Sequence, residues 1–194
     1  EPGRGGSGIF IQGTDRVIIA QNLLGKIENN CVTSDAVADR LILGRGGTAR
    51  ENRVMNNLFI GCGKAAIEFA NEHNRSDGNV YAGMPEGYLR IANPPPQQWL
   101  DLPAWREFHG WDRHGAVAAW SGSFDAAALR LTLTGTDVPA KLPIFNGIDV
   151  DFFGVPTGGT RMAGPFEALG TGFREKHVDP RPLLPGRTAE GGAR

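Results

Sequence analysis

Several features are scarce in this 194-residue chain, and each scarcity argues against a class of protein. Two cysteines, Cys31 and Cys62, are too few and too far apart for a zinc site or a disulfide framework. No apolar run approaches the roughly eighteen residues of a membrane span. The twenty basic residues are scattered and the net charge is −1, so the chain lacks the basic stripe that binds duplex DNA or an anionic membrane. The composition predicts a globular protein without a nucleic-acid partner and without a membrane span.

The two cysteines allow two interpretations. They can form one disulfide, or each can fill an apolar position in the core without pairing. We favour the second interpretation, and the sequence leaves the pairing open. The chain begins at Glu1 rather than Met, with no apolar leader behind it. Because the repeat described next already runs at Gly8, we expect the chain to be a fragment.

Glycine and proline are abundant, at 28 and 13 residues, which predicts many turns and little long helix. The first ninety residues alternate short β-rich runs with Gly, Asn and Asp turns. Asn22 and Asn57 occupy the same place before a Leu-Leu or Leu-Phe pair. A third approximate copy aligns residues 66–69 with residues 8–11 and has residues 79–81 as its next strand. Runs this short, without helices between them, predict a solenoid whose coils bury their apolar side chains against each other.

The two asparagines have a physical role in such a stack. A turn Asn can hydrogen-bond to the backbone of the neighbouring coil. It also tolerates the left-handed backbone conformation that a bend needs. We therefore expect Asn22 and Asn57 to lie at bends and to stack.

Residues 7–90 resemble the right-handed parallel β-helix, or pectate-lyase-like, superfamily of bacteria. The resemblance lies in residues 8–11, 21–24, 52–63, 65–69 and 77–81, and most strongly in Asn52–Gly63. Residues 105–114 are similar to the short helix and loop that follow the last coil in many members. Those members read Ser where this chain has Gly115. The resemblance implies an all-β chain: about three final coils of a right-handed parallel β-helix, a short helix and a β-rich extension.

The expected division places the coils in residues 1–92, an extension that packs on them in 93–180, and a flexible tail in 181–194. Three consecutive prolines, Pro94 to Pro96, donate no ladder hydrogen bonds and mark the exit from the coils. Residues 101–108 predict a short helix capped by Asp101, with Trp105 and Phe108 on one face. Residues 117–120 and 128–134 predict strands. Residues 148–154 and 163–167 are similar to family tail segments that lie back over the coils.

Enzymes of this fold bind extended sugar chains along one sheet, so the candidate site lies on outward-facing side chains. If Ile67 and Phe69 point inward, alternation turns Glu68 outward. The turn that follows is expected to hold four more polar side chains: Glu72, His73, Arg75 and Asp77. The insertion 33–50 contributes a second polar set that walls the groove beside Glu68: Asp35, Asp39, Arg40 and Arg45.

Glycoside hydrolysis needs two carboxyl groups, one as general acid and one as base or nucleophile. We predict Glu68, Glu72 and Asp35 as catalytic candidates. The candidates for substrate binding are His73, Arg75, Asp77, Arg40 and Arg45. Charged turns of a solenoid are also expected simply because they are solvated. We predict no cofactor, and no residue pattern supports calcium.

The resemblance implies a secreted, periplasmic or surface protein that acts on polysaccharide or oligosaccharide, with a glycoside hydrolase favoured. The Arg-x-Pro-x-x-Arg stretch and calcium-binding aspartates of pectate lyases are absent from the sequence, as are the Asp-Asp pair and Gly-His-Gly of polygalacturonases. The alternatives are a polysaccharide lyase, a non-catalytic polysaccharide-binding module and an adhesin-like surface solenoid. The sequence does not predict an oligomeric state.

Overall fold

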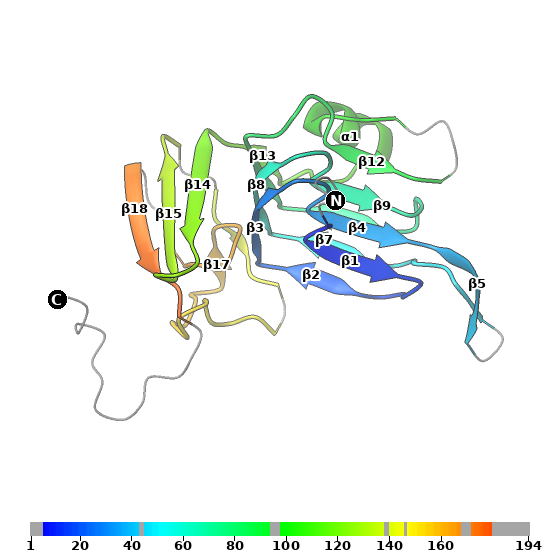
Figure 1. The fold of residues 1–194 in the computed structure, drawn as a ribbon, viewed down its shortest axis with the longest axis horizontal. Helices are drawn as coiled ribbons and strands as arrows, with labels where there is room; N and C mark the ends of the chain where they lie inside the picture. The colour runs from blue at the N-terminus through cyan, green and yellow to red at the C-terminus, as the bar shows by residue number, and fades with distance from the viewer. Residues whose placement is uncertain are drawn as a thin grey trace.

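The computed structural model describes residues 6–42, 45–93, 98–137, 140–145, 147–167 and 172–179. Only the backbone is described for residues 38–42, 45 and 172–174. The described chain is all-β, with parallel sheets and a single short helix (Figure 1). The predicted tail, residues 181–194, and the three consecutive prolines lie outside these ranges.

Three parallel sheets are built from strands that recur along the chain. Sheet A contains β1 (Ile9–Gln12), β4 (Val32–Asp35), β9 (Ile67–Phe69) and β12 (Leu89–Ile91). Sheet B contains β2 (Ile18–Ala20), β7 (Arg53–Met55) and β10 (Arg75–Asp77). Sheet C contains β3 (Leu23–Ile27), β8 (Leu58–Cys62), β11 (Val80–Ala82) and β13 (Ala116–Val117). One pass through A, B and C is called a coil below.

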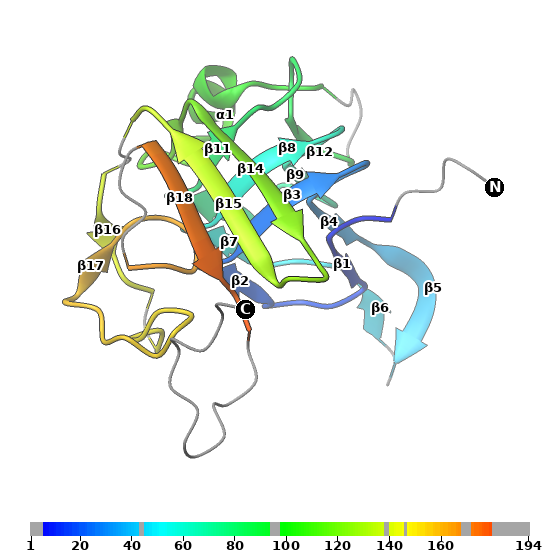
Figure 2. The ribbon, with the colours of Figure 1, turned by 60° about the vertical axis from the view of Figure 1, so that its left-hand side comes forward.

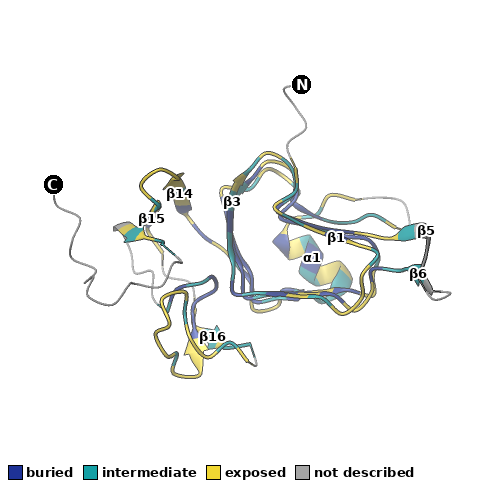
Figure 3. Cartoon of the chain, turned by 60° about the horizontal axis from the view of Figure 1, so that its bottom comes forward, coloured by how far each residue is buried: buried dark blue, intermediate teal, exposed yellow. Residues whose placement is uncertain are grey.

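The first three coils are β1–β2–β3, β4–β7–β8 and β9–β10–β11, and they superimpose when viewed along the stack (Figure 3). In sheets B and C, equivalent residues are 35 apart between the first and second coils and 22 apart between the second and third. In sheet A the corresponding spacings are 23 and 35. The longer spacing contains a hairpin, β5 (Val37–Ile42) and β6 (Arg45–Gly47). The expected insertion 33–50 is therefore shorter, because Thr33–Asp35 belong to β4.

The interior of the stack is apolar and holds the two cysteines. Val32, Ile67 and Leu89 lie in register on successive strands of sheet A and are fully buried. Cys31 and Cys62 fill core positions, as expected, but the favoured interpretation that they stay unpaired is wrong, because they form a disulfide with a Cα–Cα distance of 5.6 Å. The bond links one coil to the next, in addition to the strand ladders.

A ladder of side-chain amides runs through the bends between sheets B and C. Asn57 Oδ1 accepts from Asn22 N at 2.9 Å, and Asn79 Oδ1 accepts from Asn57 N at 2.9 Å. Asp112 Oδ1 accepts from Asn79 N at 3.0 Å and ends the ladder. The predicted stacking of Asn22 and Asn57 is confirmed. The predicted left-handed backbone is wrong for both, because the positive φ angles fall one residue earlier in each coil, at Gln21, Asn56 and Gly78.

Helix α1 (Leu102–His109) covers the end of the stack, inside the outline of the coils in Figure 3. The Asp101 side chain caps it by accepting from Ala104 N at 2.9 Å, as predicted. Trp105 is fully buried, and its Nε1 donates to Ser76 Oγ at 2.9 Å. Phe108 is 66% exposed, so the expectation that it shares the buried face with Trp105 is wrong.

Gly115 lies in the loop that follows this helix. A Cβ there would lie 2.9 Å from both Asn79 O and Asp112 Oδ1. A Cβ cannot lie this close to a backbone oxygen and a buried carboxylate oxygen unless the surrounding atoms move. We therefore expect Gly115→Ser to lower the free energy of unfolding by about 1–3 kcal/mol. Urea unfolding measures this value. Gly158→Ser is the control, because a Cβ at Gly158 meets nothing within 4 Å. Equal stability of the two variants would contradict the packing argument.

The remaining strands pack on the outside of sheet C. An antiparallel sheet of β14 (Trp120–Asp125), β15 (Arg130–Gly135) and β18 (Gly172–His177) crosses it in Figure 2. Leu58, Ile60 and Val80 of sheet C share an apolar cluster with Trp120, Leu133 and Phe166. A two-stranded ribbon, β16 (Leu142–Pro143) and β17 (Thr160–Arg161), lies alongside. Its buried Arg161 donates from Nε to Gln21 Oε1 at 2.7 Å, which ties the ribbon to the first coil.

Candidate functional site

Glu68 faces outward from the middle of sheet A. Its neighbours Ile67 and Phe69 are fully buried, so the predicted alternation is confirmed. Its carboxylate Oε2 lies 2.7 Å from Nε of Arg90, the register partner on β12, and both side chains are less than one fifth exposed. The same oxygen accepts from Asn30 Nδ2 at 3.2 Å. These contacts give Glu68 a structural role, and its catalytic role stays a prediction.

The turn between β9 and β10 opens onto a cleft of about 340 Å³, called the turn cleft below. Three of the predicted residues, Glu72, His73 and Arg75, line it together. Its other lining residues are Arg50, Glu51, Asn74 and Trp111. Glu72 and His73 lie in the turn as expected. Arg75 belongs to β10, so its placement in the turn was wrong.

Charges of opposite sign stack across the coils at this corner. The register of sheet B, carried back into the turns, places Arg16, Glu51 and His73 at equivalent positions. Backbone bonds join them in part, because Glu51 N donates to His73 O at 2.9 Å. Arg16 Nε lies 2.7 Å from Glu51 Oε2. Both groups are largely exposed, so solvent screens this ion pair strongly.

A second stacked set runs beside the first and contains Asp15, Arg50 and Glu72. Asp15 Oδ1 accepts from Arg50 N and from Thr48 Oγ1, both at 2.8 Å. The bond from Arg50 N is the main reason that the pKa of Asp15 lies below its usual value. In the second set, and between Arg16 and Glu51 in the first, adjacent coils carry residues of opposite charge. The stacking of the turns itself therefore accounts for part of this polar cluster.

Trp111 is held at the edge of the turn cleft by other rings. His109 stacks on it with ring centroids 4.7 Å apart, and Trp105 contacts it edge-on at 5.2 Å. Phe69 contacts it edge-on at 5.8 Å. Burial lowers the pKa of His109, while the nearby charge of Glu72 acts in the opposite direction. The indole is therefore fixed beside the carboxylate of Glu72 before any ligand arrives.

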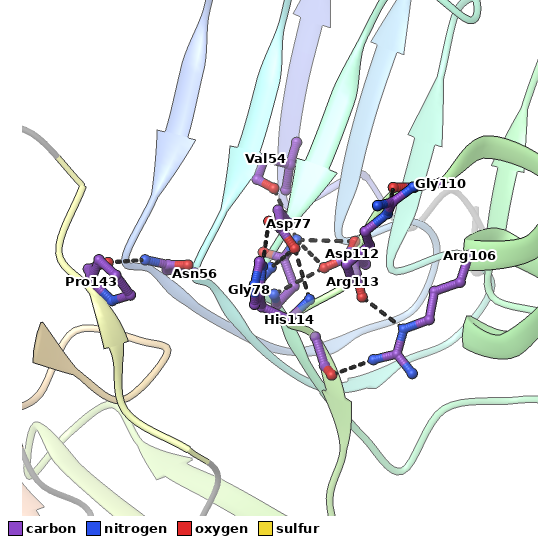
Figure 4. Close-up of polar contacts among 12 residues, drawn as sticks. Val54, Asn56, Asp77, Gly78, Arg106, Gly110, Asp112, Arg113, His114 and Pro143 are labelled. Carbon is purple, nitrogen blue, oxygen red and sulfur yellow. Dashed lines mark hydrogen bonds and ion pairs between the residues drawn. The ribbon is translucent and has the colours of Figure 1, made fainter.

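Asp77 does not line the turn cleft. It lies on β10, not on the preceding turn as predicted. Its Oδ2 is 2.8 Å from His114 Nδ1, and its Oδ1 accepts from the backbone N–H groups of His114 and Gly78 at 2.9 Å each (Figure 4). These bonds fasten the loop after α1 to sheet B, so Asp77 has a structural partner rather than a place among the cleft residues.

The expected second polar set is only partly described. Asp35 is exposed at the end of β4, where Gln12 is its register partner. It lies on the outward face of sheet A, two residues along from Thr33, which pairs with Glu68. The side chains of Asp39, Arg40 and Arg45 lie outside the described residues. Asp35 does not line the turn cleft.

Sequence reasoning missed four lining residues of the turn cleft, namely Arg50, Glu51, Asn74 and Trp111. The register of the turns, 35 and then 22 residues apart, would have placed Arg50 and Glu51 beside Glu72 and His73. No comparable signal places Trp111, because it arrives from the segment after α1. Among the described residues, no three His, Cys, Asp or Glu side chains gather as a metal site, and no helix there is long and apolar enough to cross a membrane.

Comparisons with protein-family models, curated proteins and solved structures find no match to this chain. The function must therefore be argued from the geometry of the site.

Proposed function

We propose that the protein is a carbohydrate-active right-handed parallel β-helix that acts on polysaccharide. Three parallel sheets visited in a fixed order and the ladder from Asn22 to Asp112 support this architecture. The disulfide between Cys31 and Cys62 supports a secreted, periplasmic or cell-surface location, because disulfides persist in oxidising compartments.

The turn cleft is the proposed saccharide site. The observation that carries this assignment is the convergence of a fixed indole, two carboxylates and two arginines on one cleft. An indole offers a sugar ring an apolar face, while carboxylates and guanidinium groups accept from and donate to its hydroxyl groups. Small-molecule sites combine an aromatic surface with a few polar groups in the same way.

Hydrolysis at this cleft would use Glu51 and Glu72 as its two carboxyl groups. The pair differs from the pair expected from the sequence, because Glu68 is ion-paired with Arg90 and does not line the cleft. One carboxyl group would protonate the leaving oxygen, and the other would activate water or attack the sugar. A bond between two sugars is then broken and a water molecule is added across it.

A non-catalytic polysaccharide-binding module is the second candidate. The observation that favours it is the alternation of charge between stacked turns, which explains Glu51 and Glu72 without chemistry. On this account the same indole and arginines bind a glycan chain that is not cleaved.

The test is a panel of neutral and anionic polysaccharides assayed for binding and for new reducing ends. We expect Arg75→Gln to weaken binding by about tenfold, a loss of about 1.4 kcal/mol. Glu72→Gln and Glu51→Gln are expected to abolish hydrolysis if the enzyme reading holds. The matched control is Glu175→Gln on β18, outside the turn cleft.

Three results separate the candidates. Cleavage that is lost in both cleft variants supports the hydrolase. Binding without cleavage supports the module. Binding or cleavage that is unchanged in Arg75→Gln, Glu51→Gln and Glu72→Gln rules out the turn cleft as the site, and no binding to any polysaccharide overturns the proposed function.

A further inference from the structure

A second cleft, called the Trp99 cleft below, lies beside the first turn of α1 and has a volume of about 450 Å³. Its lining residues are Glu86, Gly87, Trp99, Leu100, Asp101 and Ala104. It shares no lining residue with the turn cleft. Trp99 is 43% exposed, so part of its side chain is accessible to a ligand.

The backbone that carries Trp99 is fixed against sheet A. Leu100 forms an antiparallel bridge with Leu89, with Leu100 N donating to Leu89 O at 2.8 Å and Leu89 N donating to Leu100 O at 3.0 Å. Gly87 has a φ of +65°, and a Cβ there would lie 2.8 Å from the Cβ of Trp99. The close approach of the two segments therefore depends on glycine at position 87.

The guanidinium group of Arg90 packs over the Trp99 ring. The Arg90 guanidinium carbon lies 4.7 Å from the ring centroid. Arg90 is held in turn by Glu68 at 2.7 Å, and Glu68 accepts from Asn30. Trp99 is 43% exposed, and it lines the cleft. A chain of contacts across three coils thus fixes an exposed aromatic ring, which lowers the entropy lost when a ligand stacks on it.

We propose that the Trp99 cleft binds a neutral pyranose unit of the polysaccharide, with the sugar stacked on the exposed part of Trp99. This inference rests on the proposed function and adds a second contact point for the same kind of ligand. The carboxylates of Glu86 and Asp101 accept hydrogen bonds from sugar hydroxyl groups. Within the described part of the chain, the Asp101 side chain accepts one hydrogen bond, from Ala104 N to Oδ1.

The charge of the lining selects the class of sugar. The lining residues include two carboxylates and no Lys, Arg or His. A uronate or sulfated unit would meet these two negative charges, and the nearby guanidinium group of Arg90 is already ion-paired with Glu68, so an anionic sugar is disfavoured. The glycan bound at the Trp99 cleft is therefore neutral, and Glu68, the leading candidate of the sequence, acts as a positioning residue for its aromatic platform.

The experiment measures the binding of hexasaccharides by calorimetry to the whole chain. The probes are neutral hexamers of β-1,4-glucan, β-1,4-mannan and β-1,3-glucan, with a galacturonate hexamer as the anionic comparison. We expect at least one neutral hexamer to bind and Trp99→Ala to weaken that binding at least tenfold. Glu68→Gln is expected to weaken it less and to increase the quenching of Trp99 fluorescence by acrylamide. Phe108→Ala is the matched control, because Phe108 is an exposed aromatic residue on α1 that does not line the cleft.

Failure of this inference is distinguishable from failure of the proposed function. It is overturned if no neutral hexamer binds, if Trp99→Ala weakens the binding of the galacturonate hexamer as much as that of the neutral hexamer, or if Trp99→Ala matches Phe108→Ala. When Arg75→Gln still weakens polysaccharide binding in such a case, the turn cleft and the proposed function stand. When neither Arg75→Gln nor Trp99→Ala changes binding, this inference and the proposed function are both overturned. Circular dichroism of Trp99→Ala confirms that its fold is retained.

Discussion

Replacing Asn57 with alanine is expected to lower the free energy of unfolding by about 4 kcal/mol. Asn57 is fully buried, and its side chain takes part in four hydrogen bonds. Its Oδ1 accepts from Asn22, while its Nδ2 donates to Ile19 O and Asn79 Oδ1. Alanine would leave buried backbone donors and acceptors without partners, at about 1–3 kcal/mol for each group. Urea unfolding followed by far-ultraviolet circular dichroism measures the change.

Asn22→Ala is the matched control, because Asn22 is the first member of the same ladder and is only half-buried. Its Nδ2 donates to Ala20 O and Asn57 Oδ1, and no described residue donates to its Oδ1. We expect a loss of about 1 kcal/mol. Similar losses for Asn22→Ala and Asn57→Ala would show that the interior of the ladder carries no special stabilisation.

Most of the coil architecture could be predicted from the sequence because one residue type repeats at one place. The asparagine at the bend of each coil makes the same kind of hydrogen bond to the next coil. Asn22 and Asn57 can therefore be matched in the sequence even though a whole hairpin is inserted between them. The strand Val32–Asp35 was not predicted, because most of its residues are polar. Ser34 points inward and is buried, and its hydroxyl accepts from Ala70 N at 2.9 Å. A polar residue satisfied by the next coil cannot be recognised from hydrophobic alternation alone.

The candidate site could be predicted only where its residues are close in sequence. Glu72, His73 and Arg75 share a turn and the strand after it, and they share the turn cleft. Glu68 is four residues earlier, but the chain turns a corner between sheets after β9, so it faces a different surface. Its partner Arg90 comes from the next coil, and no local pattern indicates an ion pair across coils. Trp99 and Trp111 are placed by long-range packing of the segments around α1.

The carboxylate of Asp112 is expected to make the protein less stable as the pH rises from about 4 to above 6. It is fully buried, and burial raises its pKa from 3.8 to about 6, against hydrogen bonds from Ser76, Asn79 and Tyr81 that lower it. Because the folded state holds this proton more tightly than the unfolded state, the stabilisation is complete below the unfolded pKa. It is lost as the pH rises through the folded pKa, and it amounts to roughly 3 kcal/mol.

Asp112→Asn isolates this contribution, because the amide oxygen can still accept from Asn79 N and the charge is gone. The difference in unfolding free energy between Asp112→Asn and the parent is expected to grow in favour of asparagine by roughly 2 kcal/mol between pH 4.5 and 8, because part of the full effect is already lost at pH 4.5. His109 has the opposite effect, since its lowered pKa makes the fold less stable as the pH falls, but it is present in both proteins and cancels. Tyr81→Phe removes the donor at 2.8 Å from Asp112 Oδ2, which raises the pKa of Asp112 further and moves the transition to higher pH. A difference that stays constant across this range would mean that the ladder ends on an ordinary carboxylate, and that the fold keeps it charged without loss of stability.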